Sequence, residues 1–142
     1  MRLILGLYGP VALIALLGGC SPYHDLKNGY GLLGGGFKDQ EVSPGLFGIL
    51  VKSNAALWTN RDAVHVTWSR RAQELCGGEY IELASQELDE TLKPINSEVL
   101  RDHVTSRIAF ALCASSKLSQ QEALDVIKGL GLLPAPPRSA PM

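Results

Sequence analysis

The chain is poor in aromatic residues and carries almost no net charge, and these shortages exclude some classes of protein. Aromatic side chains make up 6% of the 142 residues, and the formal net charge is −1 at pH 7. Nucleic-acid-binding domains of this size normally display a basic surface, which this composition does not supply. The sequence therefore predicts no nucleic-acid partner, and its length suggests a single domain.

Long hydrophobic runs are also scarce, and the main one lies at the N-terminus. It covers residues 3–17 and follows the positively charged start Met1-Arg2. A helix needs roughly 20 apolar residues to cross a bilayer, so this run is short for a membrane span. A short positive start, an apolar run and small residues after it are typical of a secretory signal peptide.

The residues that end this run are Leu17-Gly18-Gly19-Cys20. This segment resembles the lipobox of bacterial lipoproteins, in which an aliphatic residue and two small residues precede a cysteine. The resemblance implies a lipoprotein precursor whose signal peptide, residues 1–19, is cleaved between Gly19 and Cys20. It also implies that the Cys20 thiol carries diacylglycerol and that its new amino group is acylated, for example with palmitate.

The resemblance also implies a location. Ser21 follows the cysteine, and serine at this place tends to direct Gram-negative lipoproteins to the outer membrane. The expected location is therefore the cell envelope, at the periplasmic face of the outer membrane. The expected partner is the membrane itself, because several acyl chains hold a protein durably on a bilayer.

The chain has three cysteines, and the odd number is informative. If Cys20 carries lipid, Cys76 and Cys113 remain as a pair, and such a pair in an exported protein usually forms a disulfide. Zinc sites usually show ligands at close spacing, which these cysteines and His65 and His103 do not. We therefore predict a disulfide, no metal and no cofactor.

The chain behind the signal peptide divides into three parts by composition. Residues 20–36 contain turn residues and glycines, which predict a lipidated cysteine followed by a flexible tether. Residues 37–132 form the predicted periplasmic domain, and the proline-rich residues 133–142 a disordered tail. The motif G-x-G-x-x-G at residues 29–34 lacks the preceding strand and following helix of a dinucleotide site, so we predict no nucleotide binding.

The first half of the domain shows a strand, a helix and a second strand. An apolar run predicts a strand at residues 46–52, after a Ser-Pro-Gly turn. A helix is expected to begin near Arg61, with Thr59 or Asn60 as its cap and Gly77-Gly78 at its end. Residues 80–84 alternate as a strand does, and the acidic residues 85–94 are either a loop or a frayed continuation of that strand.

The second half contains an ambiguous segment. Ile108, Phe110 and Leu112 alternate as in a strand, whereas Leu100, Val104 and Ile108 also fit a helix. We favour a strand over residues 105–113, because it would bring Cys113 beside Cys76. A capping box at residues 119–122 then predicts a helix that ends at Gly129 or Gly131. The predicted fold class is α+β, with a small antiparallel or mixed sheet of about three strands, one main helix and a C-terminal helix.

A second resemblance concerns the domain. It rests on Gly35-Gly36-Phe37-Lys38-Asp39, on residues 71–76 (Arg-Ala-Gln-Glu-Leu-Cys) and on Tyr80. These segments are similar to a group of small, functionally uncharacterised Gram-negative envelope lipoproteins with a G-G-[FY]-S-x start and a later R-[AS]-A-E-L helix. Lys38 and Gln73 depart from that pattern. The resemblance implies fold and location only.

No catalytic constellation is evident. His65 lies near the polar edge of the predicted helix, where a surface or half-buried role is expected. His103 lies beside Asp102 and Arg101 and is expected in a solvated charge cluster. Glu82, Glu87, Asp89 and Glu90 are expected to form a solvated acidic edge. Trp68 is expected in the core. Trp58 is expected either as a hydrophobic staple before the helix, which we favour, or as an exposed contact for a partner.

These observations favour a non-enzymatic structural or interaction role, with no small-molecule substrate and a possible protein partner in the envelope. One alternative is a redox or envelope-stress sensor, or an accessory subunit, that responds through the Cys76–Cys113 bond. Another is a small cell-wall hydrolase. That activity would need a pocket in which His65 or His103 lies within hydrogen-bond reach of a carboxylate.

Overall fold

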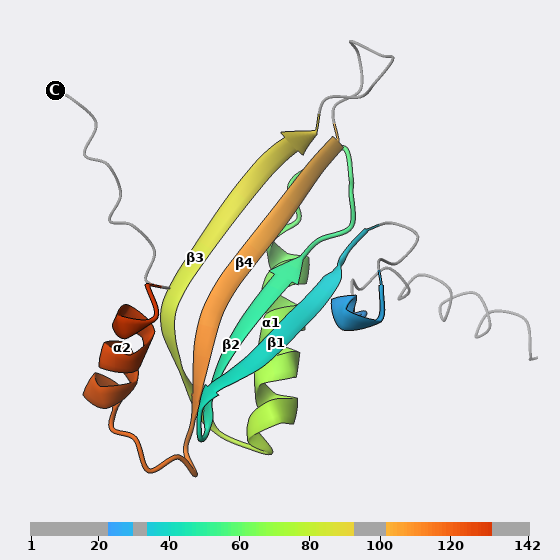
Figure 1. Ribbon diagram of the computed structural model, residues 1–142. Helices are drawn as coiled ribbons and strands as arrows, with labels where there is room; N and C mark the ends of the chain where they lie inside the picture. The colour runs from blue at the N-terminus through green and yellow to red at the C-terminus, as the bar shows by residue number, and fades with distance from the viewer. Residues whose placement is uncertain (1–22, 30–33, 93–101, 132–142) are drawn as a thin grey trace, which may run out of the picture.

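The computed structural model describes residues 23–29, 34–92 and 102–131 (Figure 1). In these residues four antiparallel strands form one sheet with the order β1-β2-β4-β3. The predicted α+β class is confirmed, with four strands in place of about three. The elements are the short 3-10 helix η2 (Leu26–Asn28), β1 (Gly36–Ser43), β2 (Leu46–Lys52), α1 (Arg61–Cys76), β3 (Tyr80–Leu92), β4 (Asp102–Cys113) and α2 (Gln120–Gly129).

The two faces of the sheet are covered by different helices. Successive side chains of a strand point to opposite faces, so alternate residues form two separate cores. On one face, strand residues pack against α1, and Figure 1 shows this helix behind the sheet. This first core contains Phe37, Ile49, Val51, Ala109 and Ala111 from the strands and Val64, Trp68 and Ala72 from α1.

The opposite face is covered by α2 over part of its area (Figure 1). Ala123 and Ile127 of α2 are fully buried against strand residues that alternate with those of the first core. The strand residues of this second core are Leu46, Leu83, Phe110 and Leu112. The chain therefore forms three layers, with the sheet between α1 and α2.

The segment that could be helix or strand is the strand β4. It extends from Asp102 to Cys113 and lies between β2 and β3. Its C-terminal half is buried on both faces, which explains why an apolar run there fits both periodicities. The predicted capping box is confirmed, since the Ser119 side chain accepts the Glu122 amide and the Glu122 carboxylate accepts the Ser119 amide.

Two parts of the sheet were not fully predicted. β1 was not predicted, because five of its eight residues are exposed or half-buried and it lies at the sheet edge. β3 continues past Ala84 to Leu92, so of the two alternatives for the acidic stretch the continuation of the strand is confirmed as far as Leu92, and residues 93 and 94 lie outside the described residues. A bulge lies between Leu83 and Gln86, where Ala84 has a φ of 50°.

The helix α1 begins and ends as predicted. Asn60 is its N-cap, although its side chain accepts no capping hydrogen bond, and Gly77 ends it in the left-handed conformation that glycine adopts readily. Neither α1 nor α2, the α-helices in the described ranges, is long and apolar enough to cross a membrane. The predicted signal peptide, with Gly19 and Cys20, lies outside the described residues.

Candidate functional site

A disulfide joins the two cysteines of the domain. Cys76 is the last residue of α1 and Cys113 the last residue of β4, and their Cα atoms are 5.1 Å apart. The bond connects positions 37 residues apart in the chain. Because Cys113 pairs with Tyr80 across the sheet, the disulfide fastens the end of the helix to the strands that it covers.

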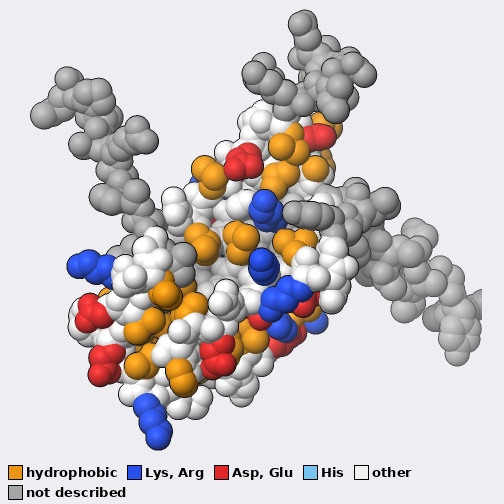
Figure 2. Space-filling model, in the orientation of Figure 1, with side chains coloured by type: hydrophobic (Ala, Val, Ile, Leu, Met, Phe, Trp, Pro, Cys, Tyr) orange, Lys and Arg blue, Asp and Glu red, His pale blue; other side chains and the backbone are white. Residues whose placement is uncertain are grey.

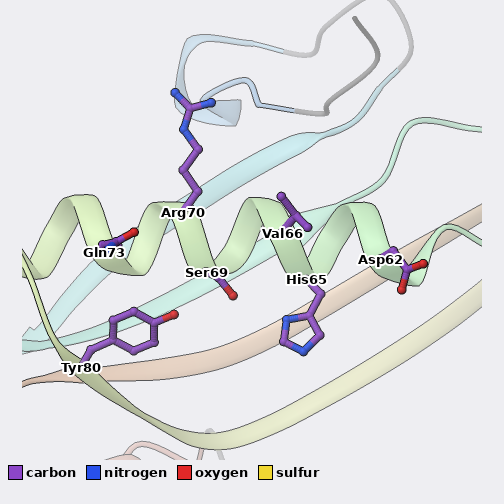
Figure 3. Close-up of a pocket in the computed structure, with 7 residues that line it drawn as sticks. All are labelled: Asp62, His65, Val66, Ser69, Arg70, Gln73 and Tyr80. Carbon is purple, nitrogen blue, oxygen red and sulfur yellow. The ribbon is translucent and has the colours of Figure 1, made fainter. Parts of the chain in front are cut away.

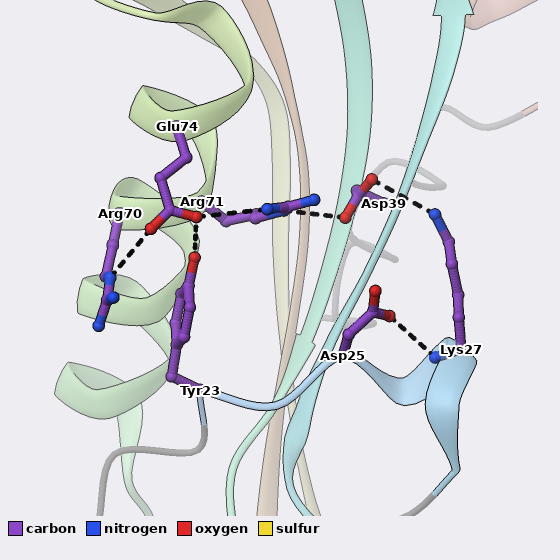
Figure 4. A network of polar contacts seen from close by, with 7 residues as sticks. All are labelled: Tyr23, Asp25, Lys27, Asp39, Arg70, Arg71 and Glu74. Atoms are coloured by element: carbon purple, nitrogen blue, oxygen red, sulfur yellow. Dashed lines mark hydrogen bonds and ion pairs between the residues drawn. The ribbon is translucent and has the colours of Figure 1, made fainter.

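Residues 23–29 are packed against the domain, and we call this segment the N-terminal clip (Figure 4). The Tyr23 hydroxyl donates a hydrogen bond to the Glu74 carboxylate of α1. The Tyr23 ring lies 4.9 Å from the ring of Phe37, and the Arg70 guanidinium lies 3.8 Å from the centre of the Tyr23 ring. A cation over an aromatic face is an attractive contact, so hydrogen bonding, ring packing and charge all hold Tyr23 on α1.

Asp39 of β1 connects the clip to α1 from the other side. Arg71 Nε donates to Asp39 Oδ1 at 2.9 Å, and Lys27 Nζ lies 3.4 Å from Asp39 Oδ2. Asp39 is only 8% exposed, so its charge needs these partners. Figure 4 shows the resulting chain of contacts from Lys27 through Asp39 and Arg71 to Glu74.

Glycines allow the clip to approach the sheet. The Phe37 amide donates to the His24 carbonyl at 2.7 Å, and a β-carbon on Gly36 would overlap that carbonyl. A β-carbon on Gly35 would likewise overlap Asn54, whose side chain accepts the Gly35 amide at 3.2 Å. In the described part of the predicted tether, residues 23–29 and 34–36, these two glycines serve close packing.

The clip also shifts two ionisation equilibria. Burial and the hydrogen bond to Glu74 raise the pKa of Tyr23. The same hydrogen bond from Tyr23, followed by those from Arg70 and Arg71, lowers the pKa of Glu74. The contact is therefore strongest over the wide pH range in which the phenol is neutral and the carboxylate is ionised.

Three of the four acidic residues expected at a solvated edge are paired. Glu82 and Glu87 of β3 both bind the guanidinium of Arg107 on β4. Arg107 is 6% exposed, and its guanidinium lies 5.7 Å from the centre of the Trp68 ring. The solvated-edge prediction is therefore wrong for these two residues, because cross-strand neighbours carry the opposite charge.

Asp89 is the third paired acid. The Thr105 hydroxyl donates to it at 2.7 Å and the Arg61 guanidinium also binds it. These two contacts, in that order, lower the pKa of Asp89. Glu90 remains exposed, as predicted. The paired acids hold β3 to β4 and to the start of α1, which is a structural arrangement.

A shallow groove runs along the outer side of α1 (Figure 3). His65 is exposed there, and it points to the side of Tyr80, whereas Arg70 points toward the N-terminal clip. The groove is lined by Asp62, His65, Val66, Ser69, Arg70, Gln73 and Tyr80.

The other candidate histidine, His103, contacts the Thr91 hydroxyl at 3.4 Å on the β3–β4 ladder. Within residues 23–29, 34–92 and 102–131, neither His65 nor His103 makes a hydrogen bond to a carboxylate. The same residues contain no group of three or more histidine, cysteine, aspartate or glutamate side chains that could hold a metal ion. The structure thus joins Cys76 and Cys113 in the disulfide and, among the described residues, places neither histidine in a group that could hold a metal ion.

The face of the sheet opposite α1 is partly open beside α2. Figure 2 shows hydrophobic side chains on this face, with lysine and arginine side chains near them. A small hollow there is lined in part by Gly48, Leu50, Ile108 and Phe110, with Lys38 at its edge. Gly48 leaves room for the Phe110 ring, which a β-carbon at that position would crowd.

The two tryptophans behave differently. Trp68 is fully buried, as predicted. Trp58 is 65% exposed, so the prediction that it forms a hydrophobic staple is wrong. Trp58 and Leu57, which is 53% exposed, are exposed apolar side chains on the loop between β2 and α1.

No protein-family model matches this chain, and neither a curated protein nor a solved structure shows significant similarity to it.

Proposed function

We propose that the chain is a lipid-anchored protein of the bacterial cell envelope with a structural or interaction role. The observation that carries this proposal is the use of its three cysteines. Cys76 and Cys113 bond to each other, which leaves Cys20 at the end of the lipobox-like segment Leu17-Gly18-Gly19-Cys20. Lipid-modified cysteines and structural disulfides both belong to exported proteins, so the two features support one location.

The proposed location is the periplasmic face of the outer membrane. The argument rests on Ser21 after the lipidated cysteine. The proposed anchor is the diacylglyceryl group on the Cys20 thiol and the acyl chain on its amino group. Each buried CH₂ of such a chain contributes roughly 0.8 kcal/mol, so an anchor of two or three chains is durable.

The contacts among charged residues favour a non-enzymatic role. Arg107, Asp39 and Asp89 each bind side chains from neighbouring elements, and these pairs hold secondary structure together. A catalytic site requires a nucleophile, a base and a group that orients the base. The polar clusters described above instead consist of arginine–carboxylate pairs that join neighbouring elements. We therefore propose that the domain acts by contact with an envelope partner.

Metabolic labelling tests the anchor. The full chain is expressed in a Gram-negative bacterium that is fed an alkyne analogue of palmitate. We expect labelled protein whose N-terminal peptide begins with modified Cys20, and a Cys20→Ala variant that is neither labelled nor cleaved. A mature protein that begins at residue 20 without lipid would contradict the proposal.

Crosslinking tests the interaction role. Chemical crosslinking of intact cells that express the lipidated protein should recover one reproducible envelope partner. The alternative of a cell-wall hydrolase is tested with the same protein on isolated cell wall. Turnover that is lost in His65→Ala or His103→Ala, with the thermal stability unchanged, would contradict the non-enzymatic role.

A further inference from the structure

The distance between the proposed anchor and the folded domain is short. Two residues, Ser21 and Pro22, separate Cys20 from Tyr23. Consecutive Cα atoms are 3.8 Å apart, so the Cα atoms of Cys20 and Tyr23 can be at most about 11 Å apart. A free tether over residues 20–36 would instead have a root-mean-square length of roughly 20–25 Å. Because the N-terminal clip is packed on the domain, the connection between Cys20 and the domain is at most about 11 Å long and not the roughly 20–25 Å of a free tether.

Tyr23 lies on a particular side of the domain. It contacts Arg70 and Glu74 of α1, and residues four apart lie on the same side of a helix. Val66 belongs to that row and is 65% exposed, and the Arg70 side chain is 58% exposed. The short connection thus enters the domain where α1 meets the β1 edge of the sheet, because Tyr23 also packs against Phe37.

The opposite side of the domain is formed by α2. The sheet separates the two helices, because their cores use alternate residues of the same strands. Layers of secondary structure pack roughly 10 Å apart, so α2 lies about 20 Å from α1. A connection of at most about 11 Å keeps Tyr23 close to the lipid headgroups, so the side of α1 that Tyr23 contacts lies nearer to them than α2 does.

We propose that the side of α1 that carries the N-terminal clip is the surface that the domain turns toward the phospholipid headgroups. This inference rests on the proposed lipidation of Cys20. The surface is defined by Tyr23, Lys27, Val66 and Arg70. Lys27 and Arg70 have half-exposed cationic side chains, which are attracted to lipid phosphates, and Val66 offers an apolar contact. The groove along α1 shares Val66 and Arg70 with this surface, whereas α2 lies on the other face of the sheet.

Site-specific photo-crosslinking to lipid tests this orientation. A photoreactive amino acid is placed either at Val66 or, as the matched control, at Leu130, which ends α2 and is 52% exposed. The lipidated full chain is reconstituted in vesicles of phosphatidylethanolamine and phosphatidylglycerol and irradiated. We expect several-fold more lipid adduct from position 66 than from position 130.

Two further variants test whether the N-terminal clip causes the proposed orientation of the domain on the membrane. A ten-residue Gly-Ser insertion between Pro22 and Tyr23 lengthens the connection without changing the domain, and Tyr23→Ala releases the clip. Both are expected to lower the adduct at position 66 to the level at position 130. An unchanged ratio after the insertion would overturn the inference.

The outcomes separate this inference from the proposed function. Equal adducts at positions 66 and 130 in protein that floats with the vesicles would overturn the orientation alone. Protein without lipid on Cys20, which does not float with the vesicles, would overturn both. Circular dichroism of each variant confirms that the adducts come from folded protein.

Discussion

The carbonyl oxygen of His24 occupies the space that a β-carbon on Gly36 would need. The same oxygen accepts the amide of Phe37 at 2.7 Å, so the backbone of the N-terminal clip runs directly against the start of β1. This contact forms a parallel bridge between Asp25 and Phe37. The clip is thus attached by backbone as well as by side chains.

Gly36→Ala should therefore detach the clip. The added methyl group forces the His24 carbonyl away, and overpacking of this kind costs about 1–3 kcal/mol. Hydrogen exchange measures the effect, because the Phe37 amide should lose its protection while amides in β4 keep theirs. Gly78→Ala is the control, since a β-carbon at Gly78 meets no atom within 4 Å. Equal exchange in the two variants would show that the contact does not matter.

Replacement of both Cys76 and Cys113 by serine should destabilise the domain. The bond closes a loop of 37 residues, and the loss of such a constraint on the unfolded chain costs about 3–4 kcal/mol. Urea unfolding of the oxidised protein and of the double variant gives the difference, and thiol counting of unreduced protein should find neither cysteine free. A variant that keeps its stability but alters an envelope stress response would instead favour the redox-sensor alternative.

Arg107→Met should destabilise the domain more than Arg61→Met does. Arg107 is buried and binds two carboxylates, and hydrogen bonds to charged groups contribute about 1.5–3 kcal/mol. The Arg61 side chain is 65% exposed, and surface pairs contribute about 0–1 kcal/mol. The difference in the free energy of unfolding between the two variants measures the effect. Equal losses would contradict the structural role given to Arg107.

Acid should weaken the domain through Asp89 and Glu74. The Thr105 hydroxyl and Arg61 lower the pKa of Asp89, and Tyr23 lowers the pKa of Glu74. A carboxyl group with a lowered pKa in the folded state stabilises the fold above its unfolded pKa of about 4. That stabilisation is lost as the pH falls through the folded pKa. Unfolding free energies between neutral pH and about pH 3 should decline, and Asp89→Asn should reduce the decline.

Elements whose ends carry local signals could be predicted from the sequence. The helix α1 buries residues at steps of three and four and has a glycine at its end, and α2 follows a capping box. The choice of strand for β4 depended on the position of Cys113 relative to Cys76, because its apolar run fits both structures. For the two helices local residues carry enough information to identify the element, whereas β4 required a relation between residues 37 positions apart.

The remaining features depend on contacts between distant residues. β1 and β3 are the two edge strands of the sheet, and β1 and the outer half of β3 are polar. In the sequence their charged side chains favour a loop, because the strands with which they pair are not evident there. Arg107, which binds Glu82 and Glu87, lies 20 residues or more away from both in the chain. The glycines before Phe37 resemble a linker for the same reason, because the atoms that they accommodate belong to His24 and Asn54.

The position of β4 has a consequence for how the chain folds. β4 is the last strand in the sequence order of the sheet, yet it pairs with both β2 and β3. Before it is available, β1 and β2 are an isolated hairpin, which is marginal in water. Pairing of Leu46 with Leu112 joins residues far apart in sequence, and such non-local pairing slows folding. The sheet can therefore be completed only after the chain has been made as far as Cys113, the last residue of β4.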